Sequence, residues 1–294
     1  MLNTDNMKLN EMPMVQNIQK LREIADDYDV FIIDLWGVLH NGVKIFLPAM
    51  EALEQLKKAH KKVYLVTNNP KTSIENIQKL TQMGLSSEFY TELVSAGQKC
   101  LEMFLDNEIL PEYQRPLKTL ILEEGMPCSW AETAGIIRVD DINRVDIVLG
   151  FHIAENVIDM SGYIPMLKHL LARDILFVCA NPDMYATRNM ERFARVGLLA
   201  ETYEQMGGRV LYVGKPYPLI YKDILQKHSK DRVLMVGDSL ITDIKGANQM
   251  GIDGMLISMG NHREELSQVP HTDLSSFFSK KGIVPTFISP QLFW

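Results

Sequence analysis

The stretch that decides the fold is Tyr28–Asp–Val–Phe–Ile–Ile–Asp34, a nearly continuous apolar run that ends at a carboxylate. Strands that are apolar on both faces belong to parallel sheets covered by helices on both sides. A helical pattern follows over 47–60, then a second apolar run over 63–66, and then a second helical pattern from 74 to Gly84. This strand–helix–strand–helix order predicts an α/β fold built from right-handed parallel units.

Further apolar runs continue the pattern downstream. The additional predicted strands cover 119–122, 145–149, 176–180, 210–213 and 233–236. Four predicted strands are followed closely by a polar side chain suited to chemistry, namely Asp34, Thr67, Lys215 and Asp238. Ligands of open α/β sheets bind outside the carboxyl ends of the strands. We therefore expect these four side chains to converge at one edge of the sheet.

Asp34 is the first candidate for catalysis. A carboxylate exposed after a buried strand can attack phosphorus and carry a covalent aspartyl-phosphate. An aspartate in the same place can equally serve as a helix cap or a turn former. The residue by itself leaves both interpretations open, and its companions at the other strand ends favour the catalytic one.

The segment Gly237–Asp–Ser–Leu–Ile–Thr–Asp243 places two carboxylates on the turn after the last strong strand. Mg²⁺ is a hard cation that prefers one or two carboxylates together with water and substrate phosphate. Asp238 suits direct or water-mediated ligation, and Asp243 suits a supporting position that orients Lys215 or the ligand waters. The alternative is an N-cap at Asp238 and an exposed helix face at Asp243.

Lys215 and the segment 67–69 supply candidates for binding a phosphoryl group. A positioned ammonium neutralises a carboxylate cluster and offsets charge on a transferring phosphoryl group, although a single lysine is by default a solvated surface residue. Thr67, Asn68 and Asn69 offer a hydroxyl, side-chain donors and main-chain N–H groups near a predicted helix start, which suits phosphate oxygens.

Composition limits the partners and the compartment. The 294-residue chain has 30 basic and 37 acidic residues, a formal charge of −7, which argues against a nucleic-acid partner because such partners require a basic patch. Cys100, Cys128 and Cys179 show no metal-ligand spacing, as expected of buried thiols in a reducing compartment. No signal peptide is apparent, and no apolar stretch approaches the length of a bilayer span. We expect a cytoplasmic protein with no membrane partner.

The motifs resemble, in chain order, the four motifs of the haloacid dehalogenase superfamily. The matching segments are Asp34–Leu–Trp–Gly–Val–Leu39, Val66–Thr–Asn–Asn69, Val213–Gly–Lys–Pro216 and Val236–Gly–Asp–Ser–Leu–Ile–Thr–Asp243. The chain is most similar to the class IIA, NagD-like branch, whose marks here are Thr67–Asn–Asn–Pro70, Asn181–Pro–Asp183 and Tyr212–Val–Gly–Lys–Pro–Tyr–Pro218. The resemblance covers nearly the whole of residues 30–260.

This resemblance implies a Rossmann-like, doubly wound parallel core with an inserted α/β cap domain of the C2 type. The long segment between the second and third motifs fits such a cap. We expect the core to comprise residues 1–88 and 208–294, and the cap to comprise residues 89–207.

The resemblance also implies roles for the site residues. Asp34 would be the nucleophile, and Thr67 and Lys215 would bind the phosphoryl group. The donors of Asn68 and Asn69 make these two residues further candidates for the same role. The expected Mg²⁺ site comprises Asp34, the main-chain carbonyl of Trp36, Asp238 and Asp243.

Trp36 is the main departure from the family pattern, because superfamily phosphatases have a second aspartate there as general acid and base. An indole has no proton to exchange near neutral pH, and general acid–base catalysis contributes about 10²–10⁴-fold. His40 on the following loop is a candidate substitute, against the simpler alternative of a histidine that packs locally. Dehalogenases and phosphonatases of the superfamily also lack that aspartate, although the dehalogenases do not use the metal motif kept at Asp238 and Asp243.

Two features of the predicted cap bear on the substrate. Asn181–Pro–Asp183 can line the entrance to the site, or can be a generic turn. Arg188, Arg192 and Arg195 can reach an anionic substrate, against the simpler alternative of a solvated helix face.

Three functional hypotheses follow. The first is a Mg²⁺-dependent phosphatase that acts on a small phosphorylated metabolite through an aspartyl-phosphate, slowed by Trp36. The second is a catalytically weak or inactive protein that binds a phosphate ligand or regulates. The third is different chemistry at Asp34, such as phosphonate cleavage. The intact acidic motifs and Lys215 favour the first, and Trp36 favours the second. Caps of this branch often dimerise, so the resemblance also suggests a homodimer formed through the cap.

Overall fold

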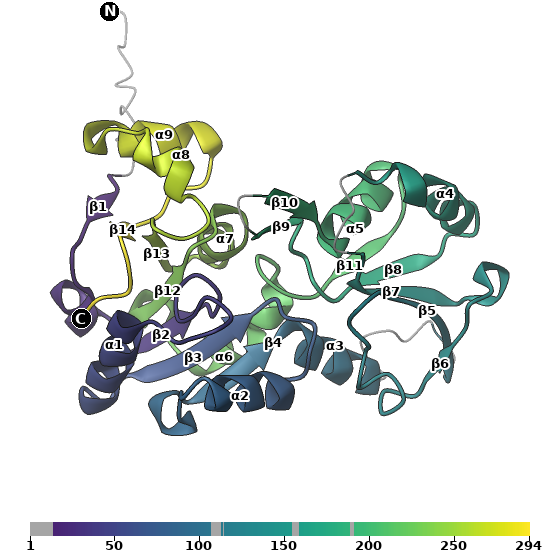
Figure 1. Cartoon of the computed structure of the whole chain (residues 1–294), viewed down its shortest axis with the longest axis horizontal. Coiled ribbons are helices and arrows are strands. Elements are labelled where there is room, and N and C mark those ends of the chain that lie inside the picture. Colours follow the sequence, from purple (N-terminus) through teal and green to yellow (C-terminus); the bar gives the residue numbers. More distant parts are fainter. Residues whose placement is uncertain (1–13, 107–112, 114, 155–158, 189–190) are drawn as a thin grey trace, which may run out of the picture.

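The computed structural model describes residues 14–106, 113, 115–154, 159–188 and 191–294. These residues form two large sheets that lie side by side, each with its own helices, and a two-stranded hairpin (Figure 1). The first sheet is at the left of the view together with the C-terminus, and the second is at the right. This mixed α/β architecture confirms the predicted fold class.

The first sheet contains the strand that precedes Asp34. Its seven described strands are all parallel, in the order β1-β14-β13-β12-β2-β3-β4. They are β1 (Gln16–Asn17), β2 (Val30–Ile33), β3 (Lys62–Thr67), β4 (Glu92–Ser95), β12 (Val233–Gly237), β13 (Asp253–Ile257) and β14 (Phe287–Ser289). Because β2 lies between β12 and β3, the carboxyl ends of these three strands meet at one edge of the sheet.

Most of the α-helices of the described residues connect consecutive strands of the sheets. They are α1 (Leu47–Lys58), α2 (Ser73–Gln82), α3 (Ala96–Leu105), α4 (Ile164–Ala172), α5 (Val196–Gln205), α6 (Lys222–Lys227), α7 (Lys245–Met250), α8 (Arg263–Ser267) and α9 (Leu274–Lys281).

Strand β2 shows why its sequence is apolar throughout. Phe31 and Ile33 pack against α1 in one core cluster, whereas Val30 and Ile32 pack against α6 and α7 in another. All four side chains are fully buried. Helices therefore cover both faces of the first sheet, which confirms the doubly wound prediction.

The second sheet has five described strands, also all parallel, in the order β11-β8-β7-β5-β6. They are β5 (Leu117–Glu123), β6 (Ile136–Arg138), β7 (Ile147–His152), β8 (Leu176–Cys179) and β11 (Val210–Tyr212). Helix α3 packs on one face through Phe104, and α4 and α5 pack on the other through Leu170 and Leu199. The segment with Arg188 and Arg192, for which a solvated helix was the simpler prediction, instead forms two antiparallel strands. They are β9 (Tyr185–Arg188) and β10 (Glu191–Ala194).

The two sheets do not divide the chain at the predicted limits of 88 and 207. Strand β4, which begins at Glu92, pairs with β3 of the first sheet, and β11, which ends at Tyr212, pairs with β8 of the second. Lys215 therefore follows a strand of the second sheet, and the expectation that four strand ends of one sheet supply the site is corrected. An apolar run shows that a strand is buried, but its sequence does not show which sheet it joins.

The connection from β3 to α2 is held by a capping box. Thr72 Oγ1 accepts the Glu75 N–H at 3.3 Å, and Glu75 Oε2 accepts the Thr72 N–H at 2.9 Å. These bonds satisfy N–H groups at the start of the helix. They fix the helix start that follows the segment 67–69, and with it the loop that faces the second sheet.

Two predictions about composition can be compared with the fold. Within the described ranges, the helices are all too short or too polar to cross a bilayer. Cys100, Cys128 and Cys179 are buried and free, as predicted.

Candidate active site

Asp34, Asp238 and Asp243 form a cluster of buried carboxylates at the carboxyl edge of the first sheet. Asp34 follows β2, Asp238 follows β12, and Asp243 lies in the short helical turn 240–244. One oxygen from each residue lies within 4.8 Å of the others. Adjacent parallel strands thus bring the acidic motifs together as expected.

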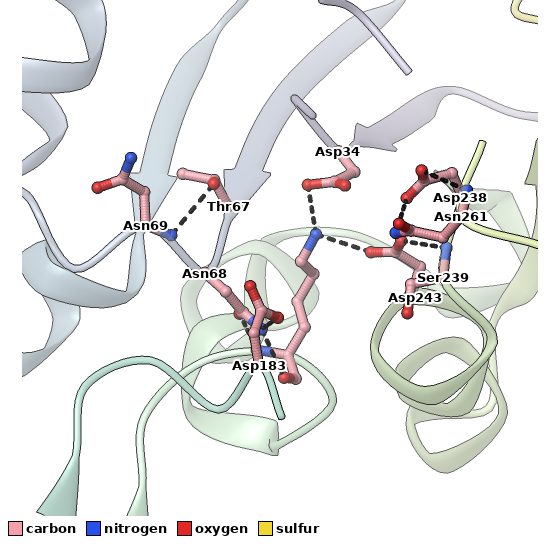
Figure 2. Close-up of polar contacts among 10 residues, drawn as sticks. Asp34, Thr67, Asn68, Asn69, Asp183, Asp238, Ser239, Asp243 and Asn261 are labelled. Carbon is pink, nitrogen blue, oxygen red and sulfur yellow. Dashed lines mark hydrogen bonds and ion pairs between the residues drawn. The ribbon is translucent and has the colours of Figure 1, made fainter. Parts of the chain in front are cut away.

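Lys215 supplies the counter-charge of this cluster. Its Nζ lies 2.5 Å from Asp34 Oδ1 and 2.7 Å from Asp243 Oδ1 (Figure 2). The side chain is 2% exposed, so these ion pairs are shielded from solvent. When all three carboxylates are ionised, the one ammonium leaves two uncompensated negative charges. This all-oxygen donor set with a surplus charge of −2 fits a hard divalent cation such as Mg²⁺.

Burial dominates the electrostatics of the cluster. It raises the pKa of Asp34, against the opposing charge of Lys215, and raises the pKa of Asp243 to about 6. Burial and the repulsion of Asp34 and Asp243 raise the pKa of Asp238 well above its usual range. Burial disfavours the charged form of Lys215, but the neighbouring carboxylates more than offset this and raise its pKa. The cluster therefore has a strong affinity for positive charge.

Neutral donors hold two of the carboxylates in place. Asn261 donates its N–H to Asp238 Oδ2 at 3.0 Å and its Nδ2–H to Asp238 Oδ1 at 3.1 Å. The Ser239 N–H donates to Asp243 Oδ2 at 3.0 Å. Asn261 was absent from the predicted site, although a polar residue soon after the apolar strand β13 was an available signal.

The main chain after Asp34 passes directly against Asp238. Gly37 has a φ of +78°, and a Cβ there would lie 2.0 Å from Asp238 Oδ2, so only glycine fits. The peptide that joins Trp36 to Gly37 therefore lies beside the carboxylates. The Trp36 residue is 53% exposed, and its indole packs edge-on against His40 with ring centroids 5.8 Å apart.

The side chain of Asn68 joins the two sheets, instead of offering its donors to a phosphate as predicted. Its Oδ1 accepts the Lys215 N–H at 2.6 Å, and its Nδ2 donates to the Lys215 carbonyl at 2.9 Å and to Asp183 Oδ1 at 2.8 Å. A side-chain amide has only two N–H donors. Both are committed, so the predicted use of this side chain for phosphate is corrected.

Thr67 and Asn69 have different positions relative to the site. Thr67 Oγ1 accepts the Asn69 N–H at 3.2 Å, and Asn69 Oδ1 accepts the Lys71 N–H at 3.0 Å. Figure 2 shows the Asn69 side chain on the far side of Thr67 from Asp34. The Thr67 hydroxyl keeps its own hydrogen as a donor at the strand end beside Asp34, whereas the Asn69 side chain shapes the loop.

His40 does not have the properties of a substitute acid and base. Its side chain is buried, and its Nδ1 accepts the Gly42 N–H at 3.0 Å. Burial, together with the charge of Lys79, lowers the pKa of His40 to about 4. The imidazole is therefore neutral near pH 7, and the simpler alternative of local packing is the better description.

Comparisons with known proteins agree with this geometry. The haloacid dehalogenase-like hydrolase family model matches residues 31–125, and the HAD-hydrolase-like model matches residues 212–276. The chain is 27% identical over 250 residues to chronophin of Rattus norvegicus, covering 82% of this chain and 79% of that protein. It is 28% identical over 238 residues to ribonucleotide monophosphatase NagD of Escherichia coli strain K12, covering 78% and 87%. A solved haloacid dehalogenase-like hydrolase from Brucella suis 1330 matches with a TM-score of 0.74 at 25% identity, over 94% of this chain and 99% of that one.

The matched segments contain the carboxylate cluster. Asp34 lies in the first segment, and Lys215, Asp238 and Asp243 lie in the second. The structural match extends over both sheets. The chain belongs to the haloacid dehalogenase superfamily of hydrolases, in its class IIA, NagD-like branch.

Proposed function

We propose that this protein is a Mg²⁺-dependent phosphatase that hydrolyses a phosphoric monoester of a small metabolite through an aspartyl-phosphate on Asp34. The observation that carries the proposal is the buried contact of Lys215 Nζ with both Asp34 and Asp243. Burying so many charges is costly in stability. Such perturbed groups gather where catalysis needs them.

Separate groups would hold the metal and the phosphoryl oxygens. The Asp34 and Asp238 carboxylates and the Trp36 carbonyl are the candidate ligands, and Asp243 would hold Lys215 in place. Bound Mg²⁺ would supply positive charge against the cluster and the transferring phosphoryl group. The phosphoryl oxygens would be bound by the Thr67 hydroxyl, the main-chain N–H of Asn68 and Lys215 Nζ.

The chemistry would proceed in two displacements at Asp34. One carboxylate oxygen attacks phosphorus in line with the leaving oxygen, and Lys215 offsets charge on the phosphoryl oxygens. Water then hydrolyses the aspartyl-phosphate and restores the Asp34 carboxylate.

The relatives support a small phosphorylated substrate and leave its identity to experiment. The E. coli relative is described as a ribonucleotide monophosphatase. The buried free thiols of Cys100, Cys128 and Cys179 support a reducing compartment, and we propose the cytoplasm.

Trp36 favours a second candidate function, a phosphate-binding or regulatory protein with little turnover. Its indole offers no proton in the position where superfamily phosphatases have their acid and base. In this alternative the carboxylates and Lys215 bind metal and phosphate without a complete reaction.

The test is phosphate release from p-nitrophenyl phosphate and from a panel of nucleotides, sugar phosphates and glycerol phosphate, with Mg²⁺ or with EDTA. Metal-dependent turnover that is lost in Asp34→Asn would establish the phosphatase. Asp29→Asn is the matched control, because its exposed carboxylate pairs with Arg232 away from the cluster. No turnover on any substrate, with Mg²⁺ or phosphate still bound, would establish the binding protein instead.

A further inference from the structure

Proton transfer is the step for which the residues after Asp34 offer no group. The Trp36 indole has no exchangeable proton near neutral pH, and His40 is neutral with Nδ1 already in use. An alkoxide leaving group still has to gain a proton, and the attacking water still has to lose one. A group from another part of the site must supply both transfers.

Asp183 is the carboxylate that the second sheet brings to the site. It lies in the turn after β8, where its N–H donates to Asn181 Oδ1 at 3.1 Å and its carbonyl accepts the Gly197 N–H at 3.2 Å. Its Oδ1 accepts the Asn68 Nδ2–H at 2.8 Å. The turn, helix α5 and the first sheet thus hold this carboxyl group in position, and the bond to Asn68 leaves Oδ2 for a substrate.

Asp183 and Asp34 lie at opposite ends of one lysine side chain. The Asn68 amide that binds Asp183 also binds the main chain of Lys215, whose Nζ contacts Asp34 (Figure 2). In-line displacement puts the attacking and leaving oxygens on opposite sides of phosphorus. A phosphoryl group bound at Asp34 between Thr67 and Lys215 would then direct its leaving oxygen toward Asp183.

We propose that Asp183 is the general acid and base of this enzyme, in the role that Trp36 cannot perform. The proposal rests on the proposed phosphatase function and adds a catalytic residue to it. Because Asp183 comes from the second sheet and Asp34 from the first, the reaction would require both sheets in their docked arrangement.

The charges around Asp183 suit a group that changes protonation state during the reaction. Burial is the largest influence on the pKa of Asp183 and raises it, and the negative charge of Asp243 raises it further. The hydrogen bond from the Asn68 amide and the positive charges of Lys215 and Arg195 lower it in part. Asp34 also interacts electrostatically with this carboxyl group. The net effect is that Asp183 holds its proton to a higher pH than an ordinary aspartate.

The two steps balance in atoms and electrons. In the first, an Asp34 oxygen bonds to phosphorus, the bond from phosphorus to the leaving oxygen breaks, and that oxygen takes the proton of Asp183. In the second, the Asp183 carboxylate takes a proton from water while the water oxygen bonds to phosphorus. The bond to Asp34 breaks, its electron pair returns to the carboxylate, and inorganic phosphate and protonated Asp183 result.

Asp183→Asn is the decisive variant, because it keeps the volume and the Oδ1 acceptor for Asn68 but cannot exchange the proton. The rates are compared for p-nitrophenyl phosphate, whose leaving group is stable without protonation, and for glycerol phosphate, whose leaving group is not. We expect kcat/KM for glycerol phosphate to fall about 10²–10⁴-fold and that for p-nitrophenyl phosphate to fall much less. Loss of the base also predicts that the aspartyl-phosphate accumulates, seen as a nitrophenolate burst and as added phosphoryl mass after acid quench.

A second pair of variants separates catalysis from folding. Asp183→Asn with Trp36→Asp places a carboxylate where superfamily phosphatases have it, and we expect it to recover at least about tenfold of the lost rate, within the range of acid–base catalysis. Asp183→Asn with Trp36→Asn should recover nothing. The exposed Asp140→Asn should retain the wild-type rates, and thermal unfolding checks that all variants fold.

Three results for Asp183→Asn would each overturn the proposal and leave Asp183 a structural partner of Asn68. They are equal losses of rate on both substrates without an accumulated phosphoenzyme, a raised KM at unchanged kcat, and full activity. Each of these outcomes leaves the phosphatase function standing, because wild type would still turn over and Asp34→Asn would not. Absence of wild-type turnover would overturn both proposals, and is recognised because Asp34→Asn then changes nothing.

Discussion

Lys215 Nζ lies 2.5 Å from Asp34 Oδ1 although the strands that precede the two residues belong to different sheets. Asn68 holds the main chain of Lys215 in the position that this contact requires, because its amide binds both the N–H and the carbonyl of Lys215. Gly214 allows the approach, since a Cβ at its φ of +135° would lie 2.7 Å from Asn68 Oδ1. The contact between Lys215 and Asp34 therefore forms only when the two sheets are packed together as they are in this structure.

Asn68→Asp should disrupt this junction with almost no change of volume. It removes both donors, to Asp183 and to the Lys215 carbonyl, and adds a charge beside the half-buried carboxyl group of Asp183. We expect the free energy of unfolding to fall by about 1–3 kcal/mol, as for buried polar groups left unpaired, and turnover to fall with it. Chemical denaturation measures the first effect. Asn69→Asp is the matched control, because its Oδ1 can still accept the Lys71 N–H; an equal loss there would contradict a specific role of Asn68.

Mg²⁺ should stabilise the folded chain, because it relieves repulsion among Asp34, Asp238 and Asp243. Free Mg²⁺ at 100 times its Kd adds about 2.7 kcal/mol to the free energy of unfolding. The increment should disappear in Asp238→Asn. It should also shrink as the pH falls below 6, because the pKa of Asp243 is about 6 and protonation removes charge from the cluster. Thermal unfolding with Mg²⁺ or EDTA measures it, with Asp29→Asn as control; an increment that persists in Asp238→Asn would place the metal elsewhere.

Trp36→Asp by itself should change kcat less than about tenfold, well below the full contribution of acid–base catalysis. The reason is that Asp183 already supplies the proton in our proposal. The substitution should be tolerated, since the residue is 53% exposed. Steady-state kinetics on glycerol phosphate, compared with Trp36→Asn, measures the effect. A gain of 10²-fold or more would show that the missing carboxylate limits the reaction and that Asp183 does not replace it.

Acidification should destabilise the chain through His40. Burial and the charge of Lys79 lower its pKa from 6.5 to about 4, so between these values the unfolded chain binds a proton that the folded chain does not. The resulting stability is fully present above pH 6.5 and is lost as the pH falls toward 4, on the order of 3 kcal/mol in total. Urea unfolding at a series of pH values should show this loss in wild type and much less of it in His40→Asn. Replacement of the exposed His60 by Asn is the control, and identical pH dependence in all three proteins would refute the assignment.

Much of the first sheet was predictable from local sequence. The run before Asp34 is apolar at every position because β2 is covered on both faces, by Phe31 and Ile33 on one side and by Val30 and Ile32 on the other. The same logic predicted β3 and β12 and the turns that follow them. Adjacent parallel strands then place Asp34 and Asp238 together, because their carboxyl ends must lie at one edge.

The partner of each polar group was decided only by the tertiary structure. The apolar sequence 210–213 was expected to form a strand of the same sheet as the one before Asp34. Its strand instead pairs with β8 of the second sheet, because strand pairing depends on residues far apart in the chain. Asn68 contains the same donors whether it faces a phosphate or a neighbouring strand, and the docked second sheet commits them to Lys215 and Asp183.

The sequence by itself therefore determined the fold class, the nucleophile candidate and the acidic motifs, because these follow from local hydrophobic patterns and from residues at strand ends. Only the tertiary structure decided that Asp183 lies at the junction with Asn68 and that His40 is a buried, neutral residue. Position, burial and charge in a folded site depend on neighbours that the chain brings together from distant segments, and a sequence motif does not contain those neighbours.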